Sequence, residues 1–395
     1  MRNINQYIWG LLGRFVPSFI FLGTTIVLAR ILTPDDFGLV GVLTIVFTVA
    51  DALTDAGLGG SLVKEKEITN LDCCTICNFN MIVSILLYAI LFISADYIEN
   101  YFNMDRLAIV TRLLSLTFVI NAVSLVPRAL LMRDLKFREL FKISILSNAI
   151  SAIVAIVAAF IGAGVFALIL YRLLVPFVGS VLSYSFSDFK YRVQFSIDSF
   201  KRLIPFGFFS SISTIVDTIY ENILTTIFGK VMGVTTTGYF YQAKKTEESI
   251  TTSLTSTIGN VAFPVLTSLR DNKESFIKES QSIMLTVAGT MIPFILLLSN
   301  YSDLVIDLLY GGQWVASSPF FRLLMYAGCF MIMENLNRSI IKSLGKGELL
   351  FSIALIKRSI GIVVLLGATF MFQDYLVQAY IICSFIGDRD RKSVV

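Results

Sequence analysis

The chain has 395 residues, of which 55% are hydrophobic and 15% charged, and its mean hydropathy is +0.77. Ordinary soluble domains carry about a quarter charged residues, so this composition excludes a soluble globular protein and indicates a polytopic membrane protein. The formal net charge of +4 comes from basic residues spread along the chain, which excludes a basic patch for nucleic acid.

Apolar segments recur along the chain at the length of about 20 residues that a helix needs to cross the hydrocarbon core. The first half contains six of them, at residues 7–29, 37–63, 73–96, 107–132, 142–161 and 164–184. The second half repeats the pattern at residues 203–228, 237–266, 280–299, 316–336, 349–372 and 375–387. The sequence therefore predicts an all-α polytopic membrane protein of about twelve helices, with one six-helix bundle at 1–184 and a second, incomplete bundle at 203–389.

The first two spans meet at a short polar corner between Arg30 and Gly38. Pro34 lacks a backbone N–H and disfavours the helical conformation at Thr33, so a helix ends there. Asp35 and Asp36 can accept hydrogen bonds at the start of the next helix and suit its positive end. The corner predicts a tight helical hairpin across a bilayer.

The longest polar gap, residues 185–202, separates the sixth span from the seventh. Phe189, Val193, Phe195 and Phe200 alternate there with lysine and arginine, which predicts a helix lying at the membrane interface. We expect this segment to be the connector between the two bundles.

Basic residues fall in alternate loops, sixteen on one side against three on the other. The richer set is Lys64, Lys66, Arg133, Lys136, Arg138, Lys142, Lys190, Arg192, Lys201, Arg202, Arg270, Lys273, Lys278, Arg338, Lys342 and Lys346. The poorer set is Arg30, Arg106 and Lys230. Because loops rich in lysine and arginine stay in the cytoplasm, we expect the N-terminus and the connector to be cytoplasmic.

The last span stops near Gly387, short of a complete twelfth helix. When residues 390–395 are back-translated, they resemble a common sequencing adapter. We expect these six residues to be non-native and the last span to be truncated.

Charged residues inside the apolar spans are the features that suggest transport, because such groups are costly in lipid and normally face a protein or water interior. Asp51 and Asp55 lie four residues apart on one face of the second span, and Asp217 and Glu221 repeat this spacing in the seventh. The dense run Lys244–Glu248 opens the eighth span and is either the lining of a vestibule or a solvated helix end.

No catalytic constellation or cofactor motif is present. The chain has no histidine, no glycine-rich phosphate loop and no nucleophile–histidine pair. Cys74 and Cys77 have a zinc-like spacing, but the pair has no second half and opens an apolar helix. The sequence therefore predicts a protein that is not an enzyme and that binds neither a metal nor a cofactor.

Several motifs resemble those of the Wzx-type polysaccharide flippases, a family related to MATE exporters and lipid II flippases. The corner Ala29–Gly38, ARILTPDDFG, resembles the first-loop signature of these flippases, and Asp55–Val63 resembles the end of their second helix. Further resemblances are an aspartate in the seventh helix with a G–Y–A turn, the turn before the tenth helix, and the loop after it. The turn before the tenth helix is Leu309–Trp314, and the loop after that helix is Leu344–Lys346. The aspartate and its turn are Asp217 with Gly229, Gly233, Gly238, Tyr239, Tyr241 and Ala243.

The resemblance implies two six-helix bundles that move undecaprenyl-diphosphate-linked oligosaccharide across the inner membrane by alternating access. It also implies a pathway shared with glycosyltransferases and a polymerase that make O-antigen, capsule or exopolysaccharide. Two alternatives stay open: a cation-coupled multidrug exporter of the MATE type, and a membrane glycosyltransferase or polysaccharide polymerase. The last normally needs a large loop with acid–base residues outside the membrane, and none is visible here.

A diphosphate that crosses a low-dielectric barrier needs compensating cations, and arginine offers a planar fork matched to phosphate oxygens. Arg14, Arg112 and Arg322 lie several residues inside apolar spans and are the candidates for a cationic lumen that binds the substrate. Arg128, Lys357 and Arg358 lie near cytoplasmic ends, which favours interfacial positions for them. The acids Asp51, Asp55, Asp217 and Glu221 either pair structurally with arginines or bind a coupling ion, H⁺ or Na⁺.

Overall fold

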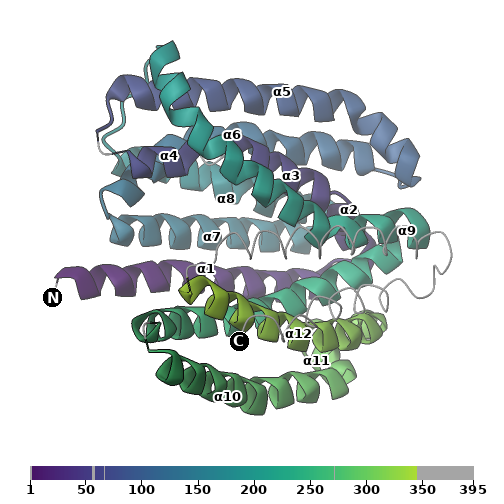
Figure 1. Ribbon diagram of the computed structural model, residues 1–395. Coiled ribbons are helices and arrows are strands. Elements are labelled where there is room, and N and C mark those ends of the chain that lie inside the picture. Colours follow the sequence, from purple (N-terminus) through teal and green to yellow (C-terminus); the bar gives the residue numbers. More distant parts are fainter. Residues whose placement is uncertain (1, 56–57, 66, 271, 345–395) are drawn as a thin grey trace. The chain divides into compact units, whose positions relative to one another are not determined.

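The computed structural model describes residues 2–55, 58–65, 67–270 and 272–344 (Figure 1). Over the first half the helices are α1 (Arg2–Ile31), α2 (Pro34–Val42), α3 (Thr44–Asp55), α4 (Leu58–Lys64), α5 (Asn70–Phe102), α6 (Leu107–Arg133), α7 (Phe137–Phe160) and α8 (Val165–Phe186). They are followed by α9 (Ile197–Leu269), α10 (Lys273–Asn300), α11 (Ser302–Tyr310), the 3₁₀ helix η1 (Gly312–Ser317) and α12 (Ser318–Ser343). The described residues contain no strand, so the all-α class is confirmed.

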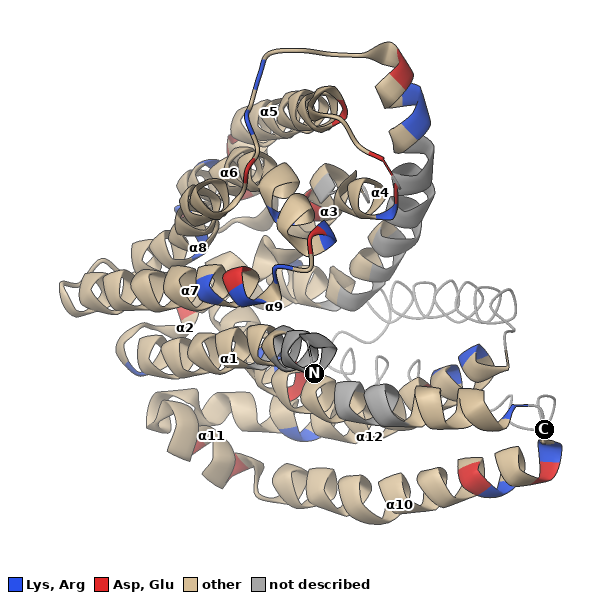
Figure 2. Cartoon of the chain, turned by 90° about the vertical axis from the view of Figure 1, so that its left-hand side faces the viewer, with Lys and Arg blue, Asp and Glu red and all other residues tan. Residues whose placement is uncertain are grey.

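Seven helices or helix pairs among the described residues are long and apolar enough to cross a membrane. Six of the expected spans match α5, α6, α7, α8, α10 and α12 closely, and the seventh is formed by α3 and α4 together. Figure 2 shows most of the described charged residues at helix ends and in connecting segments. The chain is thus a multi-span membrane protein; the spans expected at 349–372 and 375–387 and the tail 390–395 lie outside the described residues.

The first corner forms as the sequence predicts. Pro34 is the first residue of α2, and Asp36 accepts hydrogen bonds from the backbone N–H and the hydroxyl of Thr33, at 3.1 and 3.0 Å. This arrangement satisfies groups that a helix start leaves free. Asp35 instead accepts a hydrogen bond of 2.6 Å from the hydroxyl of Thr235, far along the chain.

Gly38 explains why the corner meets α9 so closely. A Cβ at this position would collide with the backbone of Val234, and one at Gly229 would collide with the side chain of Val42. Two glycines therefore let the second half of α2 and the middle of α9 approach closely, with backbone contact at Gly38. Gly233, with φ of 79°, breaks α9 into two helices at the place where the sequence predicts a turn.

By its contacts the chain forms two compact units, residues 1–237 and 238–395. In the first unit α6 packs against both α5 and α8, and α7 packs against α1 and α8. A buried apolar cluster joins α2 and α3 to α6, with the rings of Phe47 and Phe118 stacked 5.4 Å apart. The expected division at the connector differs from this grouping, because residues 203–237 of α9 belong to the first unit; the bundle boundary at 185–202 stays a prediction.

The connector is not the interfacial helix that its sequence pattern predicts. Residues 187–196 are extended and lie along α5, where side chains satisfy their backbone groups. Asn70 Nδ2 donates to Lys190 O at 3.1 Å, Asn78 Nδ2 donates to Gln194 O at 2.8 Å, and the Ser196 N–H donates to Thr75 Oγ1 at 3.1 Å. The prediction was wrong because these partners on α5 replace the hydrogen bonds that a helix would have supplied internally.

In the second unit, the described helices α10, α11 and α12 pack together with the later part of α9. Trp314 in η1 is fully buried, and its ring meets Tyr239 edge-on at 6.0 Å. Gly311, with φ of 91°, allows the sharp turn between α11 and η1. These residues explain the turn motif Leu309–Trp314 as a packing unit.

Candidate functional site

A cavity of about 340 Å³ opens inside the first unit, among its membrane-spanning helices. Helices α1, α3, α6, α7 and α8 all contribute to its wall. The lining residues are Phe21, Phe47, Asp51, Leu114, Thr117, Asn121, Arg128, Asn148, Tyr171, Arg172, Val175 and Pro176. Two guanidinium groups face one carboxylate there, so the cavity carries an excess of positive charge.

Arg128 reaches this cavity from α6 by lying against α8. A Cβ on Gly179 would collide with Arg128 Nη2, so only the missing side chain at position 179 leaves room for the guanidinium. Within the described part of the chain Arg128 makes no ion pair and no hydrogen bond, although it is partly buried. An arginine in this setting offers all five of its N–H donors to a ligand.

The other polar groups of the cavity are held in place by neighbours. Tyr171 donates its hydroxyl to Asn148 Oδ1 at 3.0 Å, and Asn148 Nδ2 donates to Ser144 O at 2.8 Å. Asn121 Nδ2 donates to Asp51 Oδ1 at 3.4 Å. Asp51 is exposed on the cavity wall, so its carboxylate is open to the same space as the two arginines.

Two of the three arginines predicted to bind substrate lie in ion pairs. Arg112 Nη2 contacts Asp96 Oδ2 at 2.7 Å, and its guanidinium lies over the Phe92 ring. In the second unit Arg322 Nη2 contacts Asp303 Oδ2 at 3.3 Å. Both arginines are about one turn inside their helices, α6 and α12, and their place in a substrate-binding lumen stays a prediction.

The remaining predicted residues lie on the expected helices, but their side chains are outside the described part. Arg14 belongs to α1, Asp55 ends α3, and Asp217 and Glu221 belong to the first stretch of α9. Of the predicted set, Asp51 is the one that the structure places in the cavity.

The sequence missed Arg128 and Arg172 as candidate site residues. Arg128 was assigned to the interface because it lies five residues before the end of α6, and Arg172 was given no role. A signal was present: Thr117, Asn121 and Arg128 are spaced 4 and 7 residues apart, which puts three polar groups on one face of an apolar helix. The helices that this face contacts could be identified only from the structure.

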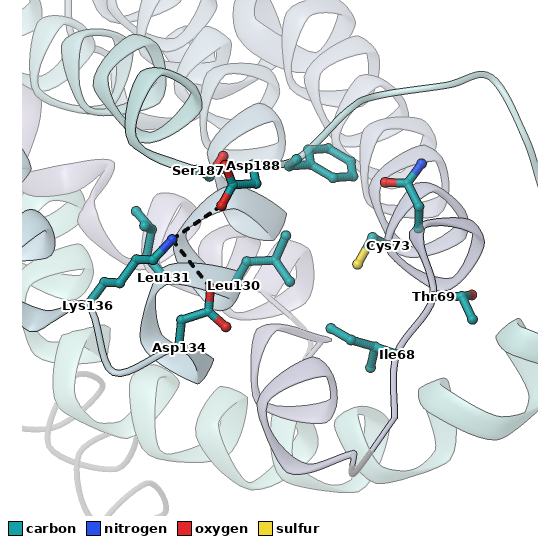
Figure 3. A pocket seen from close by; sticks show the side chains of 11 residues that line it. Ile68, Thr69, Cys73, Leu130, Leu131, Asp134, Lys136, Ser187 and Asp188 are labelled. Carbon is teal, nitrogen blue, oxygen red and sulfur yellow. Dashed lines mark hydrogen bonds and ion pairs between the residues drawn. The ribbon is translucent and has the colours of Figure 1, made fainter.

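A second cavity, of about 200 Å³, lies where three loops of the first unit meet (Figure 3). Lys136 Nζ points between Asp188 Oδ2 at 3.3 Å and Asp134 Oδ2 at 3.6 Å. The hydrogen bond to Asp188 raises the pKa of Lys136 above its ordinary value. The cation is already neutralised, so this cavity ties loops together rather than offering a charged ligand site.

Residues 27–319, well over half of the chain, match a family model described as polysaccharide biosynthesis protein. The chain belongs to this family of polysaccharide biosynthesis proteins. The matched range contains the first corner and every residue of the larger cavity except Phe21. Among the described residues of this family member, no three His, Cys, Asp or Glu side chains come together as a metal site.

Relatives are about a quarter identical to this polysaccharide biosynthesis protein. It is 24% identical to the lipopolysaccharide biosynthesis protein WzxC of Escherichia coli over 90% of this chain and 73% of that protein. It is also 24% identical to an uncharacterized membrane protein in the cps region of Klebsiella pneumoniae, over 88% of this chain and 73% of the other. The match to the teichuronic acid biosynthesis protein TuaB of Bacillus subtilis covers 76% of this chain and 63% of TuaB, at 24% identity.

Solved structures share the fold. The lipid II flippase MurJ in an inward closed conformation has a TM-score of 0.77 at 14% identity, covering 96% of this chain and 86% of MurJ. An inward-facing MATE multidrug transporter has a TM-score of 0.65 at 17% identity, covering 96% of each chain. The resemblance to Wzx-type flippases, MATE exporters and lipid II flippases is thereby confirmed.

Proposed function

We propose that this protein is a flippase that carries undecaprenyl-diphosphate-linked oligosaccharide across the inner membrane for surface polysaccharide synthesis, by alternating access and without chemistry on the substrate. Family membership and relatives named for lipopolysaccharide and teichuronic acid biosynthesis support this pathway. The fold shared with a lipid II flippase supports the mode of action. The N-terminus is cytoplasmic in this proposal, and the glycosyltransferases and the polymerase of the same pathway act before and after it.

The cavity of the first unit is the observation that carries the proposal. Arg128 and Arg172 bring two cations into a membrane-spanning bundle against one carboxylate, that of Asp51. Placing charge at that depth is expensive, and a diphosphate is a ligand that compensates it. The guanidinium of Arg128, without a protein partner in the described chain, suits a phosphate oxygen pair in bidentate geometry.

The predicted residues keep their proposed roles beside this pair. Arg14, Arg112 and Arg322 are proposed as further substrate contacts; for Arg112 and Arg322 the substrate would compete with Asp96 and Asp303. Asp51 is placed to balance the arginines of the cavity while it is empty. For Asp55, Asp217 and Glu221, structural pairing and ion coupling both remain proposals.

Substitution of the two cavity arginines tests the proposal. In a host that lacks its own flippase, Arg128→Ala and Arg172→Ala should lower surface glycan strongly, while Arg128→Lys and Arg172→Lys keep part of it. A charge-assisted hydrogen bond contributes about 1.5–3 kcal/mol, which corresponds to about a ten- to hundred-fold change in binding. Glycan is measured at equal protein abundance, with Arg192→Ala on the exposed connector as the matched control.

Full glycan display by both alanine variants would contradict the assigned site. Strong efflux of a cationic dye by the purified protein in vesicles, without any effect on glycan, would favour a multidrug exporter instead. The positive excess of the cavity argues against that outcome, because a cationic drug needs acidic walls.

A further inference from the structure

Glu247, in the second unit, is a buried carboxyl group that makes no ion pair with any described residue. The residue is 4% exposed, and within the described chain its side-chain atom Oε1 has no hydrogen-bond partner. Glutamate is almost never buried to this degree unless it is paired. An ionised carboxylate without a paired cation is very unfavourable there, so such a group takes up a proton and becomes neutral.

The nearby charges on α9 are arranged around the next residue instead. Lys245 Nζ lies 2.6 Å from Glu248 Oε2, and Lys244 Nζ lies 3.6 Å from Glu248 Oε1. Glu248 thus has two cationic neighbours, while no ion pair joins Glu247 to any described residue. Glu248 is thus a structural carboxylate held by two lysines, whereas the Glu247 carboxyl is not part of an ion pair.

The helix opposite Glu247 is α12, and it meets the carboxyl at a glycine. A Cβ on Gly328 would lie 3.1 Å from Glu247 Oε1 and 2.7 Å from Thr251 Cγ2. Contact between α9 and α12 therefore leaves no room at this point for a side chain on α12. The carboxyl is closed off by backbone, which cannot move away as a flexible side chain can.

The charged and titratable groups of the neighbouring helices do not supply a partner. The nearest charges in sequence on α12 are Arg322 and Glu334. Each is six residues from Gly328 and therefore lies roughly 120° away from it around the helix. From α11, Tyr310 bonds to Thr246 at an O···O distance of 2.8 Å. The charges of α10, from Lys273 to Glu279, are confined to its first two turns.

We propose that Glu247 is a proton-binding site that couples protonation to the contact between α9 and α12. With the helices in contact at Gly328, the carboxyl keeps its proton. When they separate, water reaches the group, the O–H bond breaks, the proton passes to water and the carboxylate remains. Closing the contact requires the reverse step, so each cycle of movement takes up and releases one proton.

This inference rests on the proposed function, because it makes H⁺ the coupling ion of the transport cycle. A metal cation fits the place poorly, since Glu247 offers a single carboxylate and the neighbouring one is already held by two lysines. Two measurements separate the proton site from the transport proposal.

The first measurement needs no substrate. Infrared spectra of the purified full chain in lipid vesicles at pH 7 should contain a protonated-carboxyl C=O band that disappears in Glu247→Gln. Glu274→Gln, at an exposed position of α10, should leave the band unchanged. Gln resembles the neutral acid in shape, so thermal stability should also be unchanged; an unaltered spectrum in Glu247→Gln would overturn the proposal.

The second measurement follows glycan display in the flippase-deleted host with the pH gradient intact or collapsed by an ionophore. Wild type and Glu274→Gln should slow several-fold on collapse, whereas Glu247→Gln should show the same rate in both conditions. A response of Glu247→Gln equal to that of wild type would overturn the coupling. A wild-type chain that displays no glycan would remove the proposed function, and the infrared result would then support or overturn the proton site by itself.

Discussion

At the scale of single residues, the contact between Arg128 and Gly179 places a guanidinium group in the cavity of the first unit. An arginine side chain near a helix end normally extends toward the interface, where water solvates it. Here the gap above Gly179 holds the guanidinium against α8, beside Arg172 and within the same cavity. A residue without a side chain therefore positions the charge.

Gly179→Ala tests this positioning role without touching a charge. The added methyl group should displace the Arg128 guanidinium, and glycan display in the flippase-deleted host should fall several-fold at unchanged abundance. Gly23→Ala is the matched control, because a Cβ there meets no atom within 4 Å. Both changes raise helix propensity by about 1 kcal/mol, so a loss of glycan display confined to Gly179→Ala reports the displaced arginine. Equal glycan display by the two variants would contradict the assignment.

At the scale of elements, the polar face at the start of α5 decides the form of the connector. Asn78 is central to it: its amide donates to Gln194 O, and its carbonyl oxygen accepts the hydroxyl of Tyr191 at 2.7 Å. Asp72 adds an ion pair of 2.7 Å with Arg202, where α9 begins. The segment between α8 and α9 is thus fixed to one helix along most of its length.

Removal of the Asn78 side chain should release this segment. In Asn78→Ala the backbone amides of residues 187–196 should exchange with deuterium about five- to thirty-fold faster, because loss of the two hydrogen bonds of this side chain lowers the cost of local opening by about 1–2 kcal/mol. Mass spectrometry of exchanged peptides measures this. Ser94→Ala removes a hydroxyl that bonds only within α5 and should leave the exchange unchanged. Equal exchange in wild type and Asn78→Ala would show that the connector does not depend on this contact.

At the scale of the whole molecule, the basic residues predict the side of the membrane on which each loop lies. A labelling experiment needs exposed sites, and Gly229, in a loop expected outside, is unsuitable because a side chain there would collide with Val42. Ile161 and Val193 are 81% and 86% exposed and belong to loops expected on opposite sides.

With the native cysteines replaced by serine, Ile161→Cys should react with a membrane-impermeant maleimide on intact cells. Val193→Cys should react only after the membrane is opened, because its loop carries the basic residues that stay in the cytoplasm. Labelling is read by the mass shift of the purified protein, and the unmodified cysteine-free chain is the control. The opposite pattern would reverse the proposed orientation.

The sequence by itself determined the class of the molecule, seven of the spans and the form of the first corner. Hydropathy adds up along about 20 neighbouring residues, and the caps of α2 lie within four residues of one another, so local chemistry suffices for both. The same holds for the turn at Gly233, where a flexible residue permits the break. The family motifs follow this local pattern as well.

Only the tertiary structure decided which charges share a cavity and how the connector runs. Arg112 pairs with Asp96, and Arg128 contacts Gly179, each across a helix interface. The connector bonds to side chains of α5 that are more than 100 residues away in the sequence. Such choices depend on how each helix is rotated about its axis and on which neighbour it meets. Spacing along one helix gives the face on which a side chain lies, but the packing of all the helices determines what that face contacts.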